Sequence, residues 1–139
     1  MLTVVLDTNV LVSSLLSQTS WPAKILDLIM SDHIVVAYDD RILGEYEEVL
    51  SRPELHIHPS RMLAVIDHIE LAGRSVTSES LPIEGFTDPD DVIFAEVFIT
   101  SNADALITGN LRHYKPLLKH DAAVLTPAQF MERFFPKHV

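Results

Sequence analysis

Short apolar runs alternate along this chain with longer segments of helical periodicity. The runs are rich in β-branched and aliphatic residues and cover residues 1–6, 33–37, 105–108 and 122–125, with a shorter one near 75–77. Strands that alternate with helices favour βα units, in which helices cover both faces of a mostly parallel sheet. The alternation therefore predicts an α/β fold, a three-layer α/β/α sandwich with a mostly parallel central sheet of four to five strands.

Helical segments fill the intervals between these runs. Apolar residues three and four positions apart, with capping and first-turn proline signals, predict helices over 9–16, from 21 onward, and over 40–51, 60–72, 88–100 and 126–134. The 139 residues contain no internal repeat and no linker-like stretch. We therefore expect residues 1–139 to form a single domain.

Composition narrows the function classes. The net charge is −10, whereas proteins that hold nucleic acid mainly through phosphates are usually basic. If the chain acts on nucleic acid, it is expected to do so locally, through a few cations or with a basic partner. The absence of cysteine excludes disulfides and thiolate metal sites, and no apolar run approaches the ~20 residues that cross a bilayer. We expect a cytoplasmic protein with no membrane contact.

The first candidate site residue is Asp7, which follows the opening apolar run directly. Thr8 and Asn9 come next and begin the first helix. A carboxylate at the carboxyl end of a central strand lies where open α/β sheets bind their ligands. The alternative is that Asp7 only caps the following helix.

Glu45 is the second candidate. It lies three residues after Ile42 and four before Val49, at the edge of the inward apolar stripe of its helix, whereas Glu47 and Glu48 point elsewhere. A carboxylate beside a buried face is costly unless a partner satisfies it. We therefore interpret Glu45 as functional and the other two glutamates as a solvated face.

The third candidate is Asp91, near the start of a strongly apolar helix. Asp88 as cap and Pro89 in the first turn already begin this helix well, so the acids could serve the helix dipole alone. One cap and one charge would suffice for that purpose, each contributing about 1 kcal/mol or less. Asp91 shares a face with Phe94, which turns it inward, and Asp88 and Asp90 are expected at the rim.

These carboxylates are predicted to meet. Crossovers in βα units share one hand, so the carboxyl ends of all strands lie along one edge, which brings Asp7, Glu45, Asp91 and Asn110 to one crevice. Carboxylates ~5 Å apart repel by about 3 kcal/mol per pair at an effective dielectric near 20. A retained proton or a cation relieves this repulsion. Oxygen ligands select a hard cation, Mg²⁺ or Mn²⁺, and such an ion suits phosphoryl chemistry.

The chain resembles the PIN-domain ribonucleases, and in particular the VapC-like toxins of prokaryotic toxin–antitoxin systems. The resemblance covers nearly the whole chain and is carried by residues 4–12, Glu45, residues 88–91, residues 106–110 and residues 125–130. It implies a PIN-like domain with metal-dependent endoribonuclease activity. It also implies an RNA substrate, a cognate antitoxin protein and a homodimer.

The resemblance also assigns roles to residues. Asp7, Glu45 and Asp91 match the acidic positions that bind Mg²⁺ or Mn²⁺ and activate water for phosphodiester hydrolysis. The positions that orient these ligands are matched by Thr8, Asn9 and Thr108.

A fourth acid often follows the fourth strand in the family, but Asn110 stands at that position here. An amide can still bind a metal without adding charge, so a second metal site is in question, and Asp88 or Asp90 would compensate in part. Beyond this strand, Arg112 and Lys115 are the expected ligands of substrate phosphate.

Two other functions compete with this hypothesis. A catalytically silent PIN-like module that binds RNA or a protein would account for Asn110 and for the charge of −10. A receiver-type phosphoacceptor domain shares the acidic crevice, but it needs a lysine at the end of the last strand, and none stands near Leu125.

Overall fold

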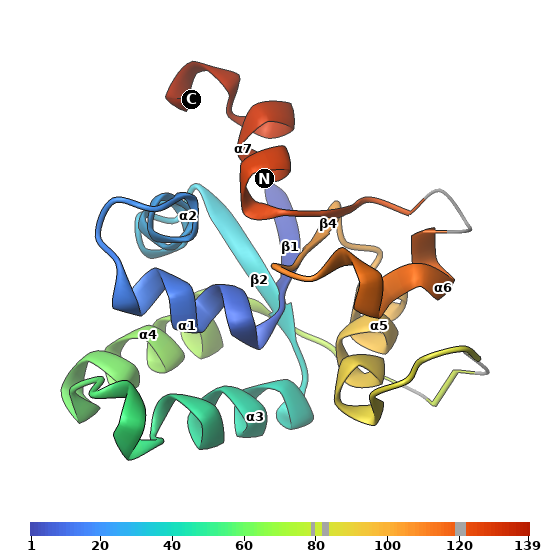
Figure 1. Ribbon diagram of the computed structural model, residues 1–139, viewed down its shortest axis with the longest axis horizontal. Coiled ribbons are helices and arrows are strands. Elements are labelled where there is room, and N and C mark those ends of the chain that lie inside the picture. The colour runs from blue at the N-terminus through green and yellow to red at the C-terminus, as the bar shows by residue number, and fades with distance from the viewer. Residues whose placement is uncertain (79, 82–83, 119–121) are drawn as a thin grey trace.

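The computed structural model describes residues 1–78, 80–81, 84–118 and 122–139 (Figure 1). Its sheet has five strands in the order β3-β2-β1-β4-β5, and all four pairings are parallel. The strands are β1 (Leu2–Leu6), β2 (Ile34–Tyr38), β3 (Arg74–Ser75), β4 (Ala105–Ile107) and β5 (Val124–Leu125). The predicted α/β fold with a parallel sheet of four to five strands is therefore confirmed.

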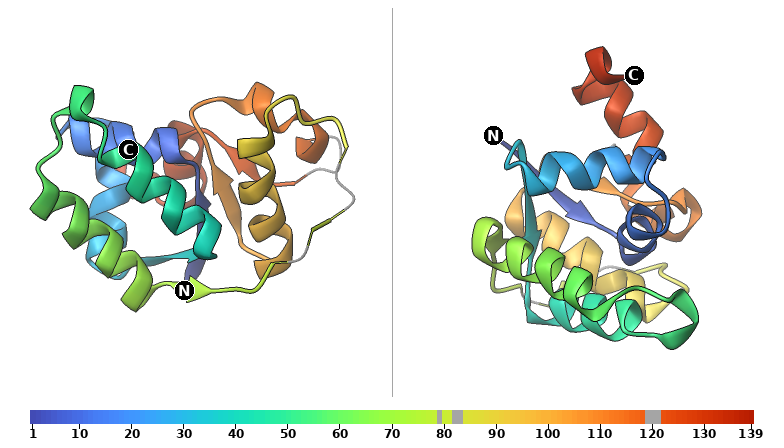
Figure 2. Two further views of the ribbon diagram at one scale, coloured as in Figure 1. Left: turned by 90° about the horizontal axis from the view of Figure 1, so that it is seen from below. Right: turned by 90° about the vertical axis from the view of Figure 1, so that its left-hand side faces the viewer.

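Helices cover both sides of this sheet (Figures 1 and 2). On one side lie α1, α2, α3 and α4, and on the other lie α5 and α6, while α7 packs against α2, β4 and β5. The helices are α1 (Thr8–Leu16), α2 (Trp21–Met30), α3 (Asp40–Leu50), α4 (Pro59–Ala72), α5 (Pro89–Ser101), α6 (Lys115–Leu118) and α7 (Pro127–Phe134). Among the described residues, no helix is long and apolar enough to cross a membrane.

The core lies against the central strand β1. Val4, Val5 and Leu6 are buried, as are all three residues of β4 beside them. Tyr46 of α3 is fully buried and its hydroxyl donates to the backbone oxygen of Leu6. A buried hydroxyl needs a hydrogen-bond partner, and this one joins α3 to the carboxyl end of β1. The end of β1, which Asp7 follows directly, is therefore held firmly in the core.

The structure differs from the sequence prediction in local detail. Helix α4 begins at Pro59 rather than after Ser60, because His58 is the cap and its ring nitrogen accepts from the amide of Ser60. Short 3₁₀ helices stand at η1 (Pro53–Leu55) and η2 (Leu111–Tyr114), where no element was predicted. Segments of three or four residues are too short to display a helical period, so the sequence pattern gives no signal for them.

Candidate metal-binding active site

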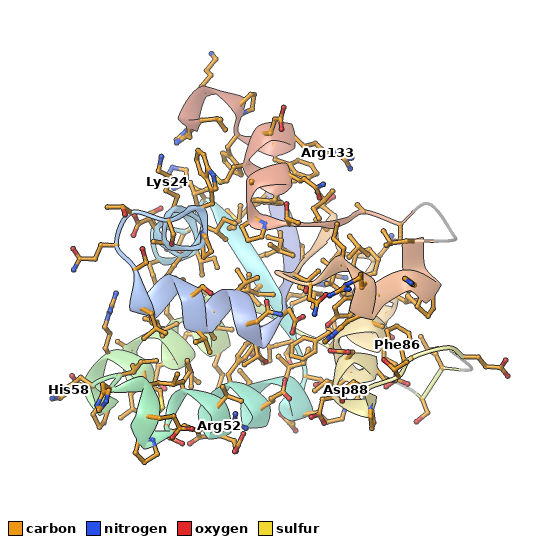
Figure 3. All side chains as sticks on the ribbon, viewed as in Figure 1. Lys24, Arg52, His58, Phe86, Asp88 and Arg133 are labelled. Carbon is orange, nitrogen blue, oxygen red and sulfur yellow. The ribbon has the colours of Figure 1, made fainter. Side chains whose placement is uncertain are left out.

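A cleft of about 530 Å³ opens beyond the carboxyl ends of β1 and β4. Its walls come from α1, α3, the start of α5 and η1, and Figure 3 labels Arg52 and Asp88, two of its residues. The cleft is lined by Asp7, Thr8, Asn9, Val12, Ser13, Glu45, Val49, Arg52, Glu54, Leu55, Asp88, Asp90, Asp91 and His113. It therefore brings together the three carboxylates that the sequence singled out, although they stand far apart along the chain.

Asp7 is held by three donors on one oxygen. Its Oδ2 accepts from the hydroxyls of Thr108 at 2.8 Å and Tyr114 at 3.0 Å, and from the amide of Asn9 at 3.3 Å. The side chain makes no capping hydrogen bond to α1. The alternative in which Asp7 only caps the helix is therefore wrong: this carboxylate is oriented by side chains from the other half of the sheet.

The partners of Asp7 are themselves fixed. The hydroxyl oxygen of Thr108 accepts a hydrogen bond from the backbone amide of Asn110 at 3.0 Å. The hydroxyl proton of Thr108 is therefore directed at Asp7. Asn9 accepts from the amide of Gly109 at 2.9 Å, and a Cβ at that glycine would lie 3.2 Å from the same oxygen. A side chain at position 109 would crowd this contact, which explains the value of a glycine directly after Thr108.

Glu45 enters the cleft from α3, where it is half-buried. Its Oε2 accepts from the hydroxyl of Thr8 at 2.6 Å, a bond that links the first turn of α1 to the middle of α3. A carboxylate that accepts a hydroxyl hydrogen bond keeps a defined orientation. Glu47 and Glu48 are exposed, as the helical spacing predicted.

Asp91 is the most constrained acid of the cleft. Its residue is 7% exposed, and its Oδ2 is buried without a hydrogen-bond partner among the described residues. The Nδ1 atom of His113 lies 3.1 Å away, close enough for an ion pair when the ring is protonated but off the line that a hydrogen bond requires. A buried carboxylate oxygen with no hydrogen-bond donor is rare, and when His113 is neutral this oxygen also lacks a positive partner.

Asp88 and Asp90 complete the acidic wall at the start of α5, where Asp88 is half-buried and Asp90 is exposed. Asp88 caps the helix, and its Oδ1 accepts from the amide of Asp90 at 2.9 Å. The cap is thus supplied by Asp88 alone, and Asp91 is not needed for it. The expected rim position agrees with the exposure of Asp90 and with the partial exposure of Asp88.

The carboxylates perturb one another. Burial, followed by the charge of Asp7, raises the pKa of Asp91 to about 6. Burial also raises the pKa of Asp7, despite the opposing hydrogen bonds from Thr108 and Tyr114. For Glu45, burial and the charges of Asp90 and Asp7 raise the pKa against the hydrogen bond from Thr8. The charged form of each of the three acids is therefore disfavoured, and a bound cation would stabilise that form.

The carboxylate oxygens of the cleft are suitable ligands for a hard divalent cation. The carboxylates offer only oxygen ligands, the kind that Mg²⁺ and Mn²⁺ prefer, and the unpartnered Oδ2 of Asp91 lies among them. In the part of the chain that the structure describes, no three acidic or histidine side chains already converge on one point. Mg²⁺ usually keeps several waters and binds through one or two carboxylates, so the arrangement suits it.

Four of the predicted site residues lie outside the cleft lining, and one of them, Thr108, still reaches Asp7 through its hydroxyl. Asn110 turns its amide to the Nε2 atom of His113 at 2.8 Å and lines a separate hollow with Asn9. Arg112 and Lys115 are exposed on η2 and at the start of α6. The residue between them, His113, is the one that reaches the cleft.

Sequence reasoning missed three residues at this site: Arg52, His113 and Tyr114. His113 and Tyr114 stand between the predicted Arg112 and Lys115, but the sequence contains no signal for η2, so it could not show which of these four residues face inward. Tyr114 is fully buried, and burial raises its pKa well above the ordinary value, so it stays protonated and donates to Asp7. Arg52 follows α3 at a position that looks like ordinary helix surface.

A second hollow of about 610 Å³ lies beside β5, away from the acids. Among the described residues that line it, the charged ones are Glu132 and Arg133, and the others are mainly apolar residues between Leu111 and Leu125. These described residues include no group of acids comparable to that in the first cleft. The chemistry of the donors, rather than the size of the hollow, therefore identifies the candidate active site.

Comparison with known proteins adds a family to this geometry. A family described as "PIN domain" matches residues 3–112 of the chain. A protein of Methanocaldococcus jannaschii named Uncharacterized protein MJ1680 is 34% identical over 145 positions, which cover 94% of this chain and 90% of the relative. No solved structure matches the chain. The matched stretch spans every strand except β5 and contains all three candidate acids.

Proposed function

The chain belongs to the PIN domain family, a nuclease-type fold, and from this premise we propose that it is a metal-dependent endoribonuclease. In this proposal Asp7, Glu45 and Asp91 hold Mg²⁺ or Mn²⁺, and the enzyme hydrolyses RNA phosphodiester bonds to leave a 5′-phosphate. Thr8, Asn9 and Thr108 orient the acids.

One observation carries this proposal. The buried Oδ2 of Asp91 has no hydrogen-bond donor among the described residues, and burial together with the charge of Asp7 raises the pKa of Asp91 to about 6. The Nδ1 atom of His113, 3.1 Å away, forms an ion pair with this oxygen only when the ring is protonated. A cation in the cleft would satisfy this oxygen and relieve the repulsion between Asp91 and Asp7.

The side chains of the cleft have distinct tasks in this mechanism. A bound Mg²⁺ or Mn²⁺ would supply positive charge to the scissile phosphate and increase the acidity of water. Thr108 and Tyr114 fix Asp7, and Thr8 fixes Glu45, so the acids need little reorganisation when a cation and a phosphate enter. Asp91, with a pKa near 6, is deprotonated at neutral pH and available to the cation.

The direct test is Mn²⁺-dependent cleavage of single-stranded RNA by purified protein. Asp7→Asn and Asp91→Asn each remove one charge from the cleft with almost no change in shape, and each is expected to abolish cleavage while the circular dichroism spectrum stays unchanged. Asp67→Asn makes the same charge change on the exposed surface of α4 and is expected to be fully active. Activity like wild type in either cleft variant would exclude this mechanism.

We further propose that the chain is the toxin of a toxin–antitoxin pair and forms a homodimer. The support is the family and the resemblance to VapC-like toxins described above. A small reading frame beside the gene should then encode a protein that binds this chain and suppresses cleavage. Expression of this chain alone should arrest growth, co-expression with the neighbour should restore it, and Asp7→Asn should be harmless without the neighbour.

A catalytically silent PIN-like module is the second candidate. Asn110 is engaged with His113 and adds no charge to the cleft, and the net charge of −10 disfavours contact with RNA. Calorimetric titration with Mn²⁺ separates the two functions. No heat of binding at millimolar Mn²⁺ would favour the silent module, whereas binding that is lost in Asp7→Asn would favour the nuclease.

A further inference from the structure

The two ends of the cleft differ in charge. Five of its acids, Asp7, Glu45, Asp88, Asp90 and Asp91, gather where β1 ends and α5 begins. The opposite end is formed by Arg52, Glu54 and Leu55, where α3 has ended and η1 begins. Among the described residues that line the cleft, Arg52 is the single arginine or lysine. In an otherwise acidic cleft, this cation defines a second point at which an anion can be held.

Helix α3 forms the wall between these ends. Glu45 and Val49 lie four residues apart on one face of α3, and Arg52 comes two residues after the end of this helix. Val12 and Leu55 add apolar surface to the cleft. From Glu45 to Leu50 the helix rises by about 7 Å, and the two residues that follow extend the chain further, so Arg52 and Glu45 are about 10 Å apart along the cleft.

This separation matches a nucleic-acid strand. A stacked strand advances ~3.4 Å per nucleotide, so 10 Å corresponds to about three nucleotides, or to fewer when the strand is extended. A cleft of about 530 Å³ has the volume of a site for one drug-sized ligand, so it admits part of a single strand, with the rest lying outside it, and is too small for a duplex. The apolar wall offers contact surface for a base or ribose between two phosphates.

Arg52 is available to an anion. Its present partner is Glu48, 3.0 Å away, and the two side chains are 48% and 63% exposed. An exposed pair at this helical spacing is weak, whereas arginine can bind a phosphate through two parallel hydrogen bonds. A phosphate that enters the cleft can therefore replace Glu48.

We propose that Arg52 is a phosphate-binding subsite for single-stranded RNA, so that the strand runs along the cleft between α1 and α3. The phosphate held there is about two to three nucleotides from the scissile bond. This inference rests on the proposed nuclease function, and it replaces Arg112 and Lys115 as the expected phosphate ligands. RNA of two nucleotides, with a single phosphodiester, cannot reach the subsite.

The test measures kcat/KM with Mn²⁺ for randomised single-stranded RNA pools of two, four and six nucleotides. Arg52→Gln is expected to lower kcat/KM about tenfold for six nucleotides and to leave the value for two nucleotides unchanged. Arg74→Gln removes the same charge from exposed strand β3 and is expected to change neither. The slope of log(kcat/KM) against log salt should also differ by about 0.7 between the two variants on the six-nucleotide pool.

Glu48→Gln provides the opposite perturbation. It frees Arg52 from its ion pair and is expected to raise kcat/KM for six nucleotides about twofold to threefold relative to Glu47→Gln, which makes the same charge change on the same helix outside the cleft lining. Cleavage in which Arg52→Gln and Arg74→Gln behave alike at every length would overturn the subsite and leave the nuclease intact. A wild-type protein inactive on all three pools would instead refute the nuclease and the subsite together.

Discussion

At the scale of single residues, the main feature of the site is the asymmetry of Asp7. All its side-chain hydrogen bonds from Thr108, Tyr114 and Asn9 go to Oδ2. The carboxylate is therefore held by one oxygen, and Oδ1 is left for a ligand in the cleft. Groups behind a metal ligand fix its orientation and influence affinity although they do not touch the ion.

Tyr114→Phe tests this arrangement, because it removes one donor to Asp7 and keeps the ring. We expect the Kd for Mn²⁺ to rise about tenfold by calorimetry. Tyr46→Phe is the matched control: it removes another buried hydroxyl, one that binds the backbone oxygen of Leu6 rather than the carboxylate. That variant should lose stability but keep the Kd. An unchanged Kd in Tyr114→Phe would show that Thr108 and Asn9 suffice.

Asp91 is expected to make the stability of the folded protein depend on pH. Its pKa is raised from 3.8 to about 6 in the folded protein, so the folded state holds this proton more tightly than the unfolded chain. The contribution to stability is therefore fully present below pH 4 and is lost as the pH rises through 6. In EDTA, we expect the drop in Tm between pH 5 and pH 7.5 to be smaller in Asp91→Asn than in wild type.

The raised pKa also governs metal binding. Because a protonated carboxyl is a poor ligand, Mn²⁺-dependent cleavage should rise with pH through about 6. Asp67→Asn on the surface of α4 serves as the control for both measurements and should follow the wild-type curves. A Tm profile in Asp91→Asn that matches wild type would mean that another group dominates the titration.

At the scale of elements, a buried ionic network holds α5 in place. Arg41 of α3 lies 2.7 Å from Glu96 of α5 and 2.8 Å from Asp39. Glu96 is only 2% exposed, and its second oxygen accepts from the amide of Leu81 at 2.7 Å. Hydrogen bonds from Ser78, Ile42 and Arg41 outweigh burial and hold the pKa of Asp39 below its ordinary value. The network joins α3, α5 and part of the segment before Asp88.

Removing the cation of this network should destabilise the fold. Arg41→Met leaves Glu96 buried without its charged partner, and since Arg41 is itself 41% exposed we expect a loss of about 2 kcal/mol rather than the larger values of fully buried pairs. Urea denaturation measures it as a lower midpoint. Arg74→Met on exposed β3 should leave the free energy of unfolding within about 0.5 kcal/mol of the wild-type value. Equal midpoints in both variants would show that water replaces Arg41 without cost.

At the scale of the whole molecule, the acids of the cleft link stability to metal. A cation that binds only the folded state stabilises it by RT ln(1 + [L]/Kd), which is about 2.7 kcal/mol at 100 times Kd. For a chain of this length we expect Mn²⁺ to raise Tm by about 5–10 °C at pH 7.5. Asp7→Asn should lose most of this rise, and KCl at equal ionic strength should not produce it. A rise that persists in Asp7→Asn would place the stabilising ion elsewhere.

The sequence predicted the fold class and the parallel sheet because apolar period and capping residues are local signals. It also predicted that Asp7, Glu45, Asp91 and Asn110 lie at one crevice, since parallel topology brings strand ends to one edge; the three acids do line one cleft, whereas Asn110 lines a separate hollow. It could not specify which oxygen of Asp7 is used, or that His113 and Arg52 face the cleft. Those facts depend on side-chain orientation across elements and on η1 and η2, which leave no periodic trace.

The position of β1 in the middle of the sheet has a consequence for synthesis. Of the five strands, β1 leaves the ribosome first. The hydroxyls that donate to Asp7, those of Thr108 and Tyr114, are made 101 and 107 residues later. A nascent chain of which only β1, β2 and β3 have left the ribosome can form neither the pairing of β1 with β4 nor the hydrogen bonds from Thr108 and Tyr114 to Asp7. Any activity of the cleft should therefore arise late in translation, and chains from interrupted synthesis should be inert.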